Sequence, residues 1–247
     1  MSNARPVAIV GEANSYSGPA IAREMARRGF DLVLGDASPG LVDEVGALGG
    51  RAVDVTGTNH LLEASGSQRL VDAALSEFGR LDSATTATGI IVTGRFLKST
   101  VEDFRKAVQG CLEVPYHFLR AVVPVMVERG GGQVLVQTSA SGARVTPGAP
   151  LYSTARAGAN HLVKNVAAEV AASGVQVNAV GTNFMDFPGF LAASGVTDEE
   201  SRRRVESQVP MGRLGDIEEF ARFCANFIDG SFTFTTGQFV SFSGGWS

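Results

Sequence analysis

A serine, a tyrosine and an arginine in the middle of the chain are spaced for proton chemistry. Ser139 follows the apolar run 133–138, which is typical of a buried strand. Tyr152 and Arg156 are four residues apart in a segment with helical spacing of its apolar residues, so they share one helix face. A permanently charged guanidinium favours the phenolate, so we expect the pKa of Tyr152 to be lowered toward neutrality, where it can act as acid and base. The Ser139 hydroxyl would hold the substrate oxygen that exchanges this proton.

The segments around these residues alternate between strand and helix. Strands are predicted at 7–10, 31–36, 51–55, 81–88, 133–138, 175–180 and 238–243. Helices are predicted at 19–29, 68–78, 101–129, 151–172 and 216–229, with a short one between the second and third strands and a solvated one within 191–210. This rhythm predicts an α/β fold: one Rossmann-like, doubly wound parallel sheet of about seven strands with helices on both faces. Because no repeat or linker divides it, we expect residues 1–247 to form a single domain.

The spacing of the three residues resembles that of the short-chain dehydrogenase/reductase superfamily, with one difference. That superfamily has Tyr-x-x-x-Lys, whereas this chain has Tyr152-x-x-x-Arg156. The combination Ser-x12-Tyr-x3-Arg is similar to the halohydrin dehalogenases, relatives of the reductases that lack the nicotinamide cofactor. This resemblance implies catalysis by Ser139, Tyr152 and Arg156. Vicinal haloalcohols would become epoxides with halide release, and halide, azide, cyanide or nitrite would open epoxides in reverse.

The first strand-to-helix loop, 11–18, reads GEANSYSG. In the reductases that it resembles, a Gly-x-x-x-Gly-x-Gly loop lets the backbone approach a pyrophosphate at a helix N-terminus. Here the later glycine positions are Ser15 and Ser17, while the ring of Tyr16 and the charge of Glu12 oppose a pyrophosphate. The dehalogenases have an aromatic residue followed by x-Gly at this place, which Tyr16 matches, although their loop usually opens with Thr and this one opens with Gly11. We therefore expect no cofactor.

Other reductase motifs are also altered. Thr86-Ala-Thr-Gly89 stands in place of Asn-Asn-Ala-Gly, and Cys111 stands where the reductases have the asparagine of their catalytic helix. Asp36 and Asp54 occupy positions at which the resembled enzymes bind ribose and adenine. We interpret both as loop-capping residues, a common role of aspartate in turns.

The segment 181–190 after the sixth strand is unusually aromatic for a loop. The resemblance implies a halide pocket here, in which the rings of Tyr16, Phe184 and Phe187 surround backbone N–H donors near Phe184 and Met185. A dry pocket of this kind strengthens each donor and stabilises a leaving anion. Thr182 and Asn183 are further candidates for halide or substrate binding. Alternatively, these aromatic residues cover the sheet end as a lid.

Composition restricts the partners. A net charge of −4 without a basic block argues against nucleic acid. No signal peptide or run of about 18 apolar residues predicts membrane insertion, so we expect a cytoplasmic location. The three histidines and two cysteines lack metal-ligand spacing, so we expect no metal.

The partners would be a small haloalcohol or epoxide and a small anion. The apolar helices 101–129 and 151–172 predict a homotetramer or dimer.

Two other functions are compatible with the sequence. The chain could be a reductase that still uses NAD(P), with a degenerate loop and with Arg156 in place of the lysine. It could also be a non-catalytic scaffold that acts through its helical interface. A scaffold has no need for Ser139, Tyr152 and Arg156 together, so we favour an enzyme.

Overall fold

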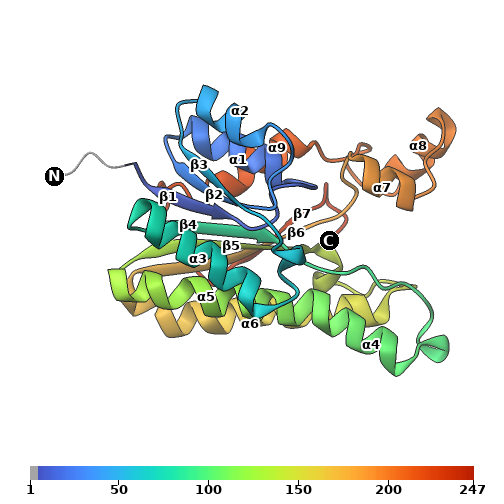
Figure 1. Cartoon of the computed structure of the whole chain (residues 1–247). Coiled ribbons are helices and arrows are strands. Elements are labelled where there is room, and N and C mark those ends of the chain that lie inside the picture. The colour runs from blue at the N-terminus through green and yellow to red at the C-terminus, as the bar shows by residue number, and fades with distance from the viewer. Residues whose placement is uncertain (1–4) are drawn as a thin grey trace.

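Seven parallel strands form one sheet in the computed structural model, which describes residues 5–247 (Figure 1). The strands are β1 (Val7–Val10), β2 (Asp31–Gly35), β3 (Ala52–Val55), β4 (Ser83–Ala87), β5 (Gly132–Ser139), β6 (Val175–Thr182) and β7 (Phe239–Phe242). Their order is β3-β2-β1-β4-β5-β6-β7, so the direction of winding reverses between β1 and β4. In such sheets ligands bind beyond the carboxyl ends of the strands at this reversal. The predicted α/β fold is confirmed.

Helices cover both faces of the sheet, as predicted (Figure 1). One face carries α1 (Gly18–Arg27), α2 (Leu41–Ala47) and α9 (Ile217–Ala225), and the other carries α3 (Ala64–Phe78), α5 (Val114–Arg129) and α6 (Pro150–Val170). None of the helices in the described part of the chain is both long and apolar enough to span a membrane.

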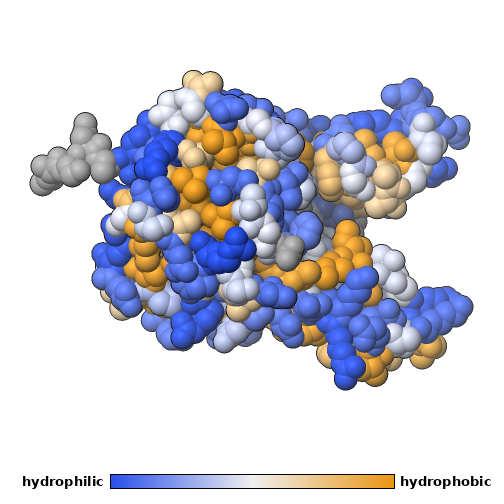
Figure 2. All heavy atoms as spheres, in the orientation of Figure 1, coloured by the Kyte–Doolittle hydropathy of each residue, from blue (hydrophilic) through white to orange (hydrophobic). Residues whose placement is uncertain are grey.

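Two short helices follow β6 and stand beside the carboxyl edge of the sheet. They are α7 (Pro188–Ala193) and α8 (Glu199–Glu206), and together they replace the one solvated helix expected within 191–210. Figure 2 shows the molecular surface hollowed between these helices and the region of α4 (Val101–Val108). Asp198 begins α8 with a capping box, in which its carboxylate accepts the N–H of Ser201. Arg202 of α8 pairs with Asp186 at 2.5 Å, which ties the helix to the end of β6.

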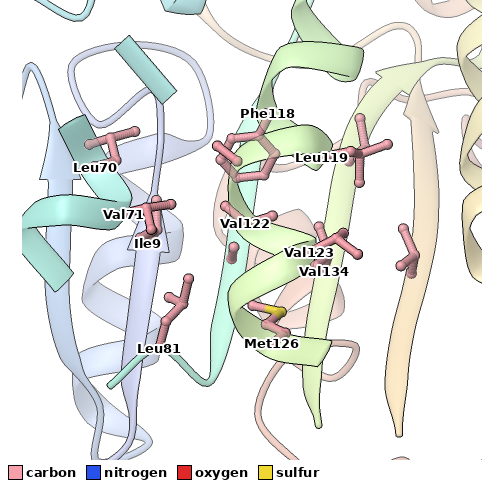
Figure 3. Close-up of a cluster of buried hydrophobic side chains, with 14 of the residues drawn as sticks. Ile9, Leu70, Val71, Leu81, Phe118, Leu119, Val122, Val123, Met126 and Val134 are labelled. Atoms are coloured by element: carbon pink, nitrogen blue, oxygen red, sulfur yellow. The ribbon is translucent and has the colours of Figure 1, made fainter. Parts of the chain in front are cut away.

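Alternate residues of the strands fill two separate apolar clusters. Val7 and Ile9 belong to the cluster under α3, α5 and α6, of which Figure 3 shows the part around Phe118. Ala8 and Val10 belong to the cluster under α1, α2 and α9. This alternation follows from the two-residue repeat of a strand. Because both faces are covered, β1 is a continuous apolar run in the sequence.

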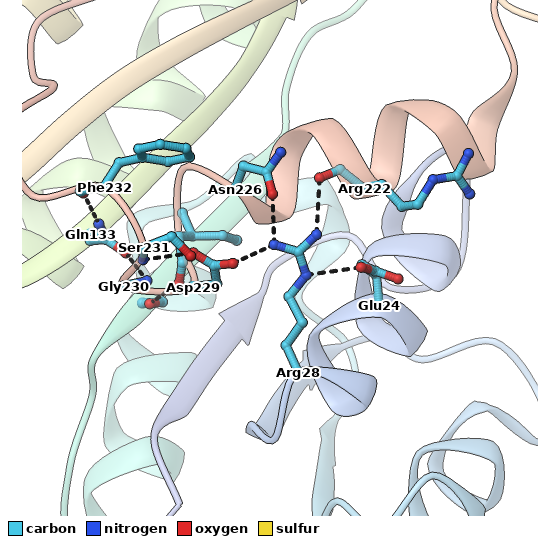
Figure 4. Close-up of polar contacts among 11 residues, drawn as sticks. Glu24, Arg28, Gln133, Arg222, Asn226, Asp229, Gly230, Ser231 and Phe232 are labelled. Carbon is cyan, nitrogen blue, oxygen red and sulfur yellow. Dashed lines mark hydrogen bonds and ion pairs between the residues drawn. The ribbon is translucent and has the colours of Figure 1, made fainter.

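Polar contacts tie the ends of α1 and α9 together (Figure 4). The guanidinium of Arg28 bonds to Glu24 at 2.8 Å, to Asn226 at 2.8 Å and to the carboxylate of Asp229. It also donates to the carbonyl of Arg222 at 3.3 Å. These contacts fix the helix layer that supports β1 and the loop after it.

The segment 101–129 is helical throughout, as predicted, but one turn within it is not α-helical. A π-helical turn, Gln109–Glu113, separates α4 from α5. Pro115 lies just after this turn and has no N–H to donate to the carbonyl four residues earlier, which accounts for the break in the ordinary pattern. Gly110 lies so close to the 89–90 segment that a Cβ on it would be 2.4 Å from the Ile90 nitrogen. The turn therefore brings the helix against the edge of the candidate site. The predicted helix 68–78 also begins earlier, at Ala64.

Candidate active site

A cavity of about 740 Å³ opens at the carboxyl edge of the sheet. Its volume lies within the usual range for small-molecule sites, about 300–1,000 Å³. All nine site residues predicted from the sequence line it: Tyr16, Ser139, Tyr152, Arg156, Thr182, Asn183, Phe184, Met185 and Phe187. The structure thus brings together residues from three separated stretches of the chain, around positions 16, 139–156 and 182–187.

Ser139 is the last residue of β5 and is 6% exposed. It pairs in register with Thr182, the last residue of β6. The Ser139 hydroxyl accepts a hydrogen bond from the Ser141 N–H at 3.2 Å and lies 3.4 Å from the Thr182 carbonyl. The first contact fixes the oxygen, whereas the second is long for a hydroxyl donor. A substrate oxygen in the cavity can therefore compete for the Ser139 proton.

Tyr152 and Arg156 lie one turn apart in the first half of α6, as their spacing predicts. Both are buried, at 9% and 4% exposed. The guanidinium carbon of Arg156 lies 5.0 Å from the centroid of the Tyr152 ring. This distance is within the range of cation–π contacts. A permanent positive charge thus stands beside the phenol, and at low local dielectric it stabilises negative charge that develops there.

Thr88, just after β4, holds the Arg156 guanidinium. One terminal nitrogen of Arg156 donates to the Thr88 hydroxyl at 2.9 Å, and the other donates to the Thr88 carbonyl. Thr88 is itself fixed, because its hydroxyl donates to the Gln137 carbonyl at 2.8 Å. Gly89 leaves the room that this arrangement needs: at its φ of +115°, a Cβ would lie 1.9 Å from the guanidinium. The Nε of Arg156 is buried without a partner among the described residues.

The sequence reasoning missed this role of Thr88 and Gly89. In the sequence, Thr88 and Gly89 were interpreted only as part of the segment 86–89 that departs from the Asn-Asn-Ala-Gly motif of the reductases. The signal was present, because Thr88 is the last residue of the predicted strand 81–88, at the edge where the site forms.

The ring of Tyr16 stands inside the cavity at the start of α1. Its hydroxyl donates to the Thr182 hydroxyl at 2.7 Å, and its ring packs against Phe187 with centroids 4.8 Å apart. Burial raises the pKa of Tyr16 well above its ordinary value of 10.0, so the phenol stays neutral. Tyr16 therefore shapes the cavity, while Tyr152 is the tyrosine that a cation accompanies.

The segment 183–185 differs from the expected halide pocket in one respect. The Phe184 N–H donates to the side-chain oxygen of Asn183 at 3.0 Å, so this predicted donor is occupied. We find no hydrogen-bond acceptor for the Met185 N–H among the residues that the structure describes. The Phe184 ring packs between Phe190 and Trp246, with centroids 5.7 and 5.6 Å away. The Met185 side chain is buried at 2% exposed, so only part of this residue faces the cavity.

Glu12 and His60 add an acid and an imidazole to the same cavity. Glu12 is buried, and its carboxylate lies 2.7 Å from Nδ1 of His60. Burial raises the pKa of Glu12, while the contact with His60 partly offsets that effect. The sequence marked Glu12 only as a charge in the loop and found no partner for His60. A pair 48 positions apart leaves no local signal.

Asp36 and Asp54 cap loops, which confirms their predicted role. The Asp36 carboxylate accepts the N–H and the hydroxyl of Thr58, at 2.9 and 2.6 Å, and the N–H of Gly57. Asp54 accepts the N–H of Ala37 at 2.8 Å. Within the described part of the chain, no group of three or more His, Cys, Asp or Glu side chains could hold a metal ion.

The chain is thus a Rossmann-like protein with a Ser–Tyr–Arg group in a cavity at the carboxyl edge of its parallel sheet. A family model described as enoyl-(acyl carrier protein) reductase matches residues 11–247. The chain is 30% identical over 247 residues to the 3-oxoacyl-(acyl-carrier-protein) reductase of Synechocystis sp., which covers 97% of this chain and 96% of the relative. This chain therefore belongs to the short-chain dehydrogenase/reductase superfamily.

Two further relatives agree with this assignment. The 2,5-dichloro-2,5-cyclohexadiene-1,4-diol dehydrogenase LinX of Sphingobium indicum is 29% identical over 249 residues, covering 98% of this chain and 96% of the relative. The solved structure of an acetoin dehydrogenase from Enterobacter cloacae has a TM-score of 0.83 at 27% identity, covering 98% and 96% of the two chains. These relatives are named as reductases or dehydrogenases, and none of them is named a halohydrin dehalogenase. The comparisons thus favour the reductase alternative over the dehalogenase expected from the sequence.

Proposed function

We propose that this member of the superfamily is a cofactor-independent halohydrin dehalogenase. The observation that carries the proposal is the first loop, where the Tyr16 ring and the Glu12 carboxylate both enter the cavity that holds Ser139, Tyr152 and Arg156. A tyrosine beside a fixed cation supplies an acid and base, and the hydroxyl of Ser139 supplies a hydrogen bond to the substrate oxygen. This chemistry needs positioning and proton transfer, without a hydride.

The residues of the first loop do not fit a dinucleotide. A pyrophosphate would rest at the N-terminus of α1, where the loop 11–18 begins the helix. Glu12 places a buried carboxylate in this loop, and Tyr16 fills space at its end. Gly18 is packed against the loop itself, since a Cβ on it would lie 1.7 Å from the Glu12 carbonyl oxygen. The carboxylates of Asp36 and Asp54 already accept backbone N–H groups, that of Thr58 and that of Ala37 respectively. No step of the proposed reaction passes through a nicotinamide.

The proposed reaction is an internal displacement. Tyr152 takes the proton of the substrate hydroxyl, and Arg156 stabilises the charge that the phenol carries before the transfer. Ser139 holds the same oxygen by a hydrogen bond. The oxygen then forms a bond to the neighbouring carbon as the carbon–halogen bond breaks, and the halide leaves with the electron pair. The region around Tyr16, Phe187 and the Met185 N–H would receive the halide, because an apolar wall and a donor without a competing acceptor suit a large anion.

The second candidate is an NAD(P)-dependent dehydrogenase or reductase. The family model and the names of the relatives favour it. In that function Arg156 would stand in the place of the superfamily's lysine, and Tyr152 would protonate the carbonyl oxygen of a substrate. It requires the loop around Tyr16 to move away from the helix N-terminus.

One experiment separates the two candidates. Bromide release from a vicinal bromoalcohol is measured without added cofactor for the wild type, for Tyr152→Phe and for the control Tyr116→Phe, whose side chain is 51% exposed on α5. We expect release by the wild type and the control and at least a 100-fold loss in Tyr152→Phe, about the contribution of general acid–base catalysis. NADH binding is followed in parallel by fluorescence. Absence of bromide release together with NADH binding would establish the reductase instead.

A further inference from the structure

The Glu12–His60 pair is built like an acid–base pair and faces the same cavity as Tyr152. The Glu12 side chain is 9% exposed, whereas that of His60 is 67% exposed. The carboxylate therefore lies beneath the imidazole, and the imidazole lies between it and solvent. A carboxylate that accepts from one ring nitrogen fixes the tautomer and leaves the lone pair on the other nitrogen. The geometry thus leaves Nε2 of His60 as the proton acceptor.

The backbone under His60 is strained to hold this position. His60 has φ of +53° and Leu61 has φ of +56°, in the left-handed region that glycine favours. Such a conformation is unfavourable for residues other than glycine and persists where the surroundings enforce it. Leu61 is fully buried and anchors the turn. A loop without a role at the site would relax at lower cost with a glycine here.

Two other charged groups lie within electrostatic reach of the pair or line the same cavity. The negative field of Asp36 reaches Glu12 and raises its pKa, although Asp36 is itself bonded to the backbone at Thr58. Arg156 lines the cavity, but its hydrogen bonds go to Thr88. Glu12 and His60 are therefore separate from the Tyr152–Arg156 pair in their contacts.

We propose that Glu12 and His60 form a second acid–base site, which removes the proton from a nucleophile that enters the cavity as a neutral weak acid, such as hydrogen cyanide. The proposal rests on the proposed function, since that function opens an epoxide with a small anion. A nucleophile such as azide is already an anion at neutral pH and needs no base. Hydrogen cyanide is almost entirely neutral there, so its use at this pH requires a proton acceptor.

The step balances in protons and electrons. Nε2 of His60 takes the proton of hydrogen cyanide, and the electron pair of the broken bond stays on the cyanide carbon. That carbon forms a bond to an epoxide carbon as the ring carbon–oxygen bond breaks. The ring oxygen takes the proton of Tyr152, and the product is a β-hydroxynitrile. The exposed His60 returns its proton to solvent, and Tyr152 regains one from the same source.

The test compares cyanide and azide as nucleophiles toward one epoxide at pH 7. The variants are Glu12→Gln and His60→Gln, and the control is His161→Gln, an exposed histidine on α6. We expect the ratio of the cyanide rate to the azide rate to fall about 100-fold in both variants and to stay constant in the control. The ratio cancels any loss of folded protein. In both variants it should recover as the pH rises and cyanide becomes an anion in solution.

The wild type provides a second measurement that needs no variant. If His60 removes the proton, the wild-type cyanide rate depends weakly on pH over the range in which the free anion increases tenfold per unit. A wild-type rate that follows the free anion, or an unchanged ratio in both variants, overturns the second site. Absence of azide opening by the wild type is a different result, which refutes the proposed function and the second site with it.

Discussion

The contact between Thr88 and Arg156 allows the sharpest test of how the site is held together. Thr88→Val keeps the shape of the side chain and the carbonyl contact, but it removes the hydroxyl, which accepts from the guanidinium at 2.9 Å and donates to the Gln137 carbonyl at 2.8 Å. A hydrogen bond to a charged group contributes about 1.5–3 kcal/mol to stability. Because Arg156 is 4% exposed and its Nε is already unpaired, water cannot readily replace the lost acceptor. The neutral contact to Gln137 contributes about 0.5–1.5 kcal/mol more, so we expect the free energy of unfolding to fall by about 2–4.5 kcal/mol.

Thr86→Val is the matched control, because Thr86 lies in β4, two residues before Thr88. The Thr86 hydroxyl donates to the carbonyl of Ala87 at 3.1 Å, a neutral contact away from Arg156. Its loss should cost about 0.5–1.5 kcal/mol. For a chain of this length each kcal/mol lowers Tm by about 2–4 °C, so Tm should fall by about 4–18 °C in Thr88→Val and about 1–6 °C in Thr86→Val.

Activity provides the discriminating readout. If the same 1.5–3 kcal/mol is lost in the transition state, kcat for bromide release falls about 10- to 150-fold in Thr88→Val. We expect KM to change little, since the substrate does not contact Thr88 in the proposed reaction, and kcat of Thr86→Val to stay near the wild-type value. Urea unfolding and steady-state kinetics on the three proteins give both quantities. A Thr88→Val protein with lowered stability and an unchanged kcat would refute the inference that Thr88 positions Arg156 for catalysis.

Two further predictions concern the first loop. Tyr16→Phe removes the hydrogen bond to Thr182 but keeps the ring, so Tm should fall by about 1–6 °C without any gain of NADH binding; an unchanged Tm would show that the contact contributes nothing. In Glu12→Gln the pH dependence of stability should change, because the Glu12 pKa is raised above its ordinary value of 4.5 in the folded protein. The folded state then binds this proton more tightly than the unfolded state, so wild-type stability falls as pH rises from about 4.5 through the raised pKa, and the variant escapes this loss. Urea unfolding from pH 4 to pH 8 measures the free energy of unfolding of both proteins. A difference between them that stays constant over this range would contradict the prediction.

The sheet was predictable because its strands are buried on both faces. Val7–Val10 is apolar throughout, and the buried strand Gly132–Ser139 has the apolar run 134–136 at its centre. Ser139, Tyr152 and Arg156 were predictable because they lie on one continuous strand-to-helix segment, where spacing determines the relative position of side chains.

Contacts between distant segments were not predictable in this way. The Thr88 contact depends on how far β4 and α6 lie apart, and the Glu12–His60 contact depends on a turn with left-handed backbone at non-glycine residues. The π-helical turn within 101–129 could have been predicted from Pro115, whose missing N–H interrupts the α-helical hydrogen-bond pattern. The occupied N–H of Phe184 depends on a side-chain rotamer of Asn183, which spacing does not determine.

The strained residues of the described chain gather at the cavity. The non-glycine residues with positive φ are Tyr16, Asp36, His60, Leu61 and Phe184. Tyr16, His60 and Phe184 line the cavity, Leu61 anchors His60, and Asp36 caps the turn that leads to it. Each costs about 1–3 kcal/mol, so the cavity is the least relaxed part of the molecule. Nothing in the sheet requires this cost, since the two apolar clusters lie beneath it. The strain holds a tyrosine ring, an imidazole and an aromatic wall in the space above Ser139, which is the expected result if the chemistry of this cavity differs from that of a dinucleotide site.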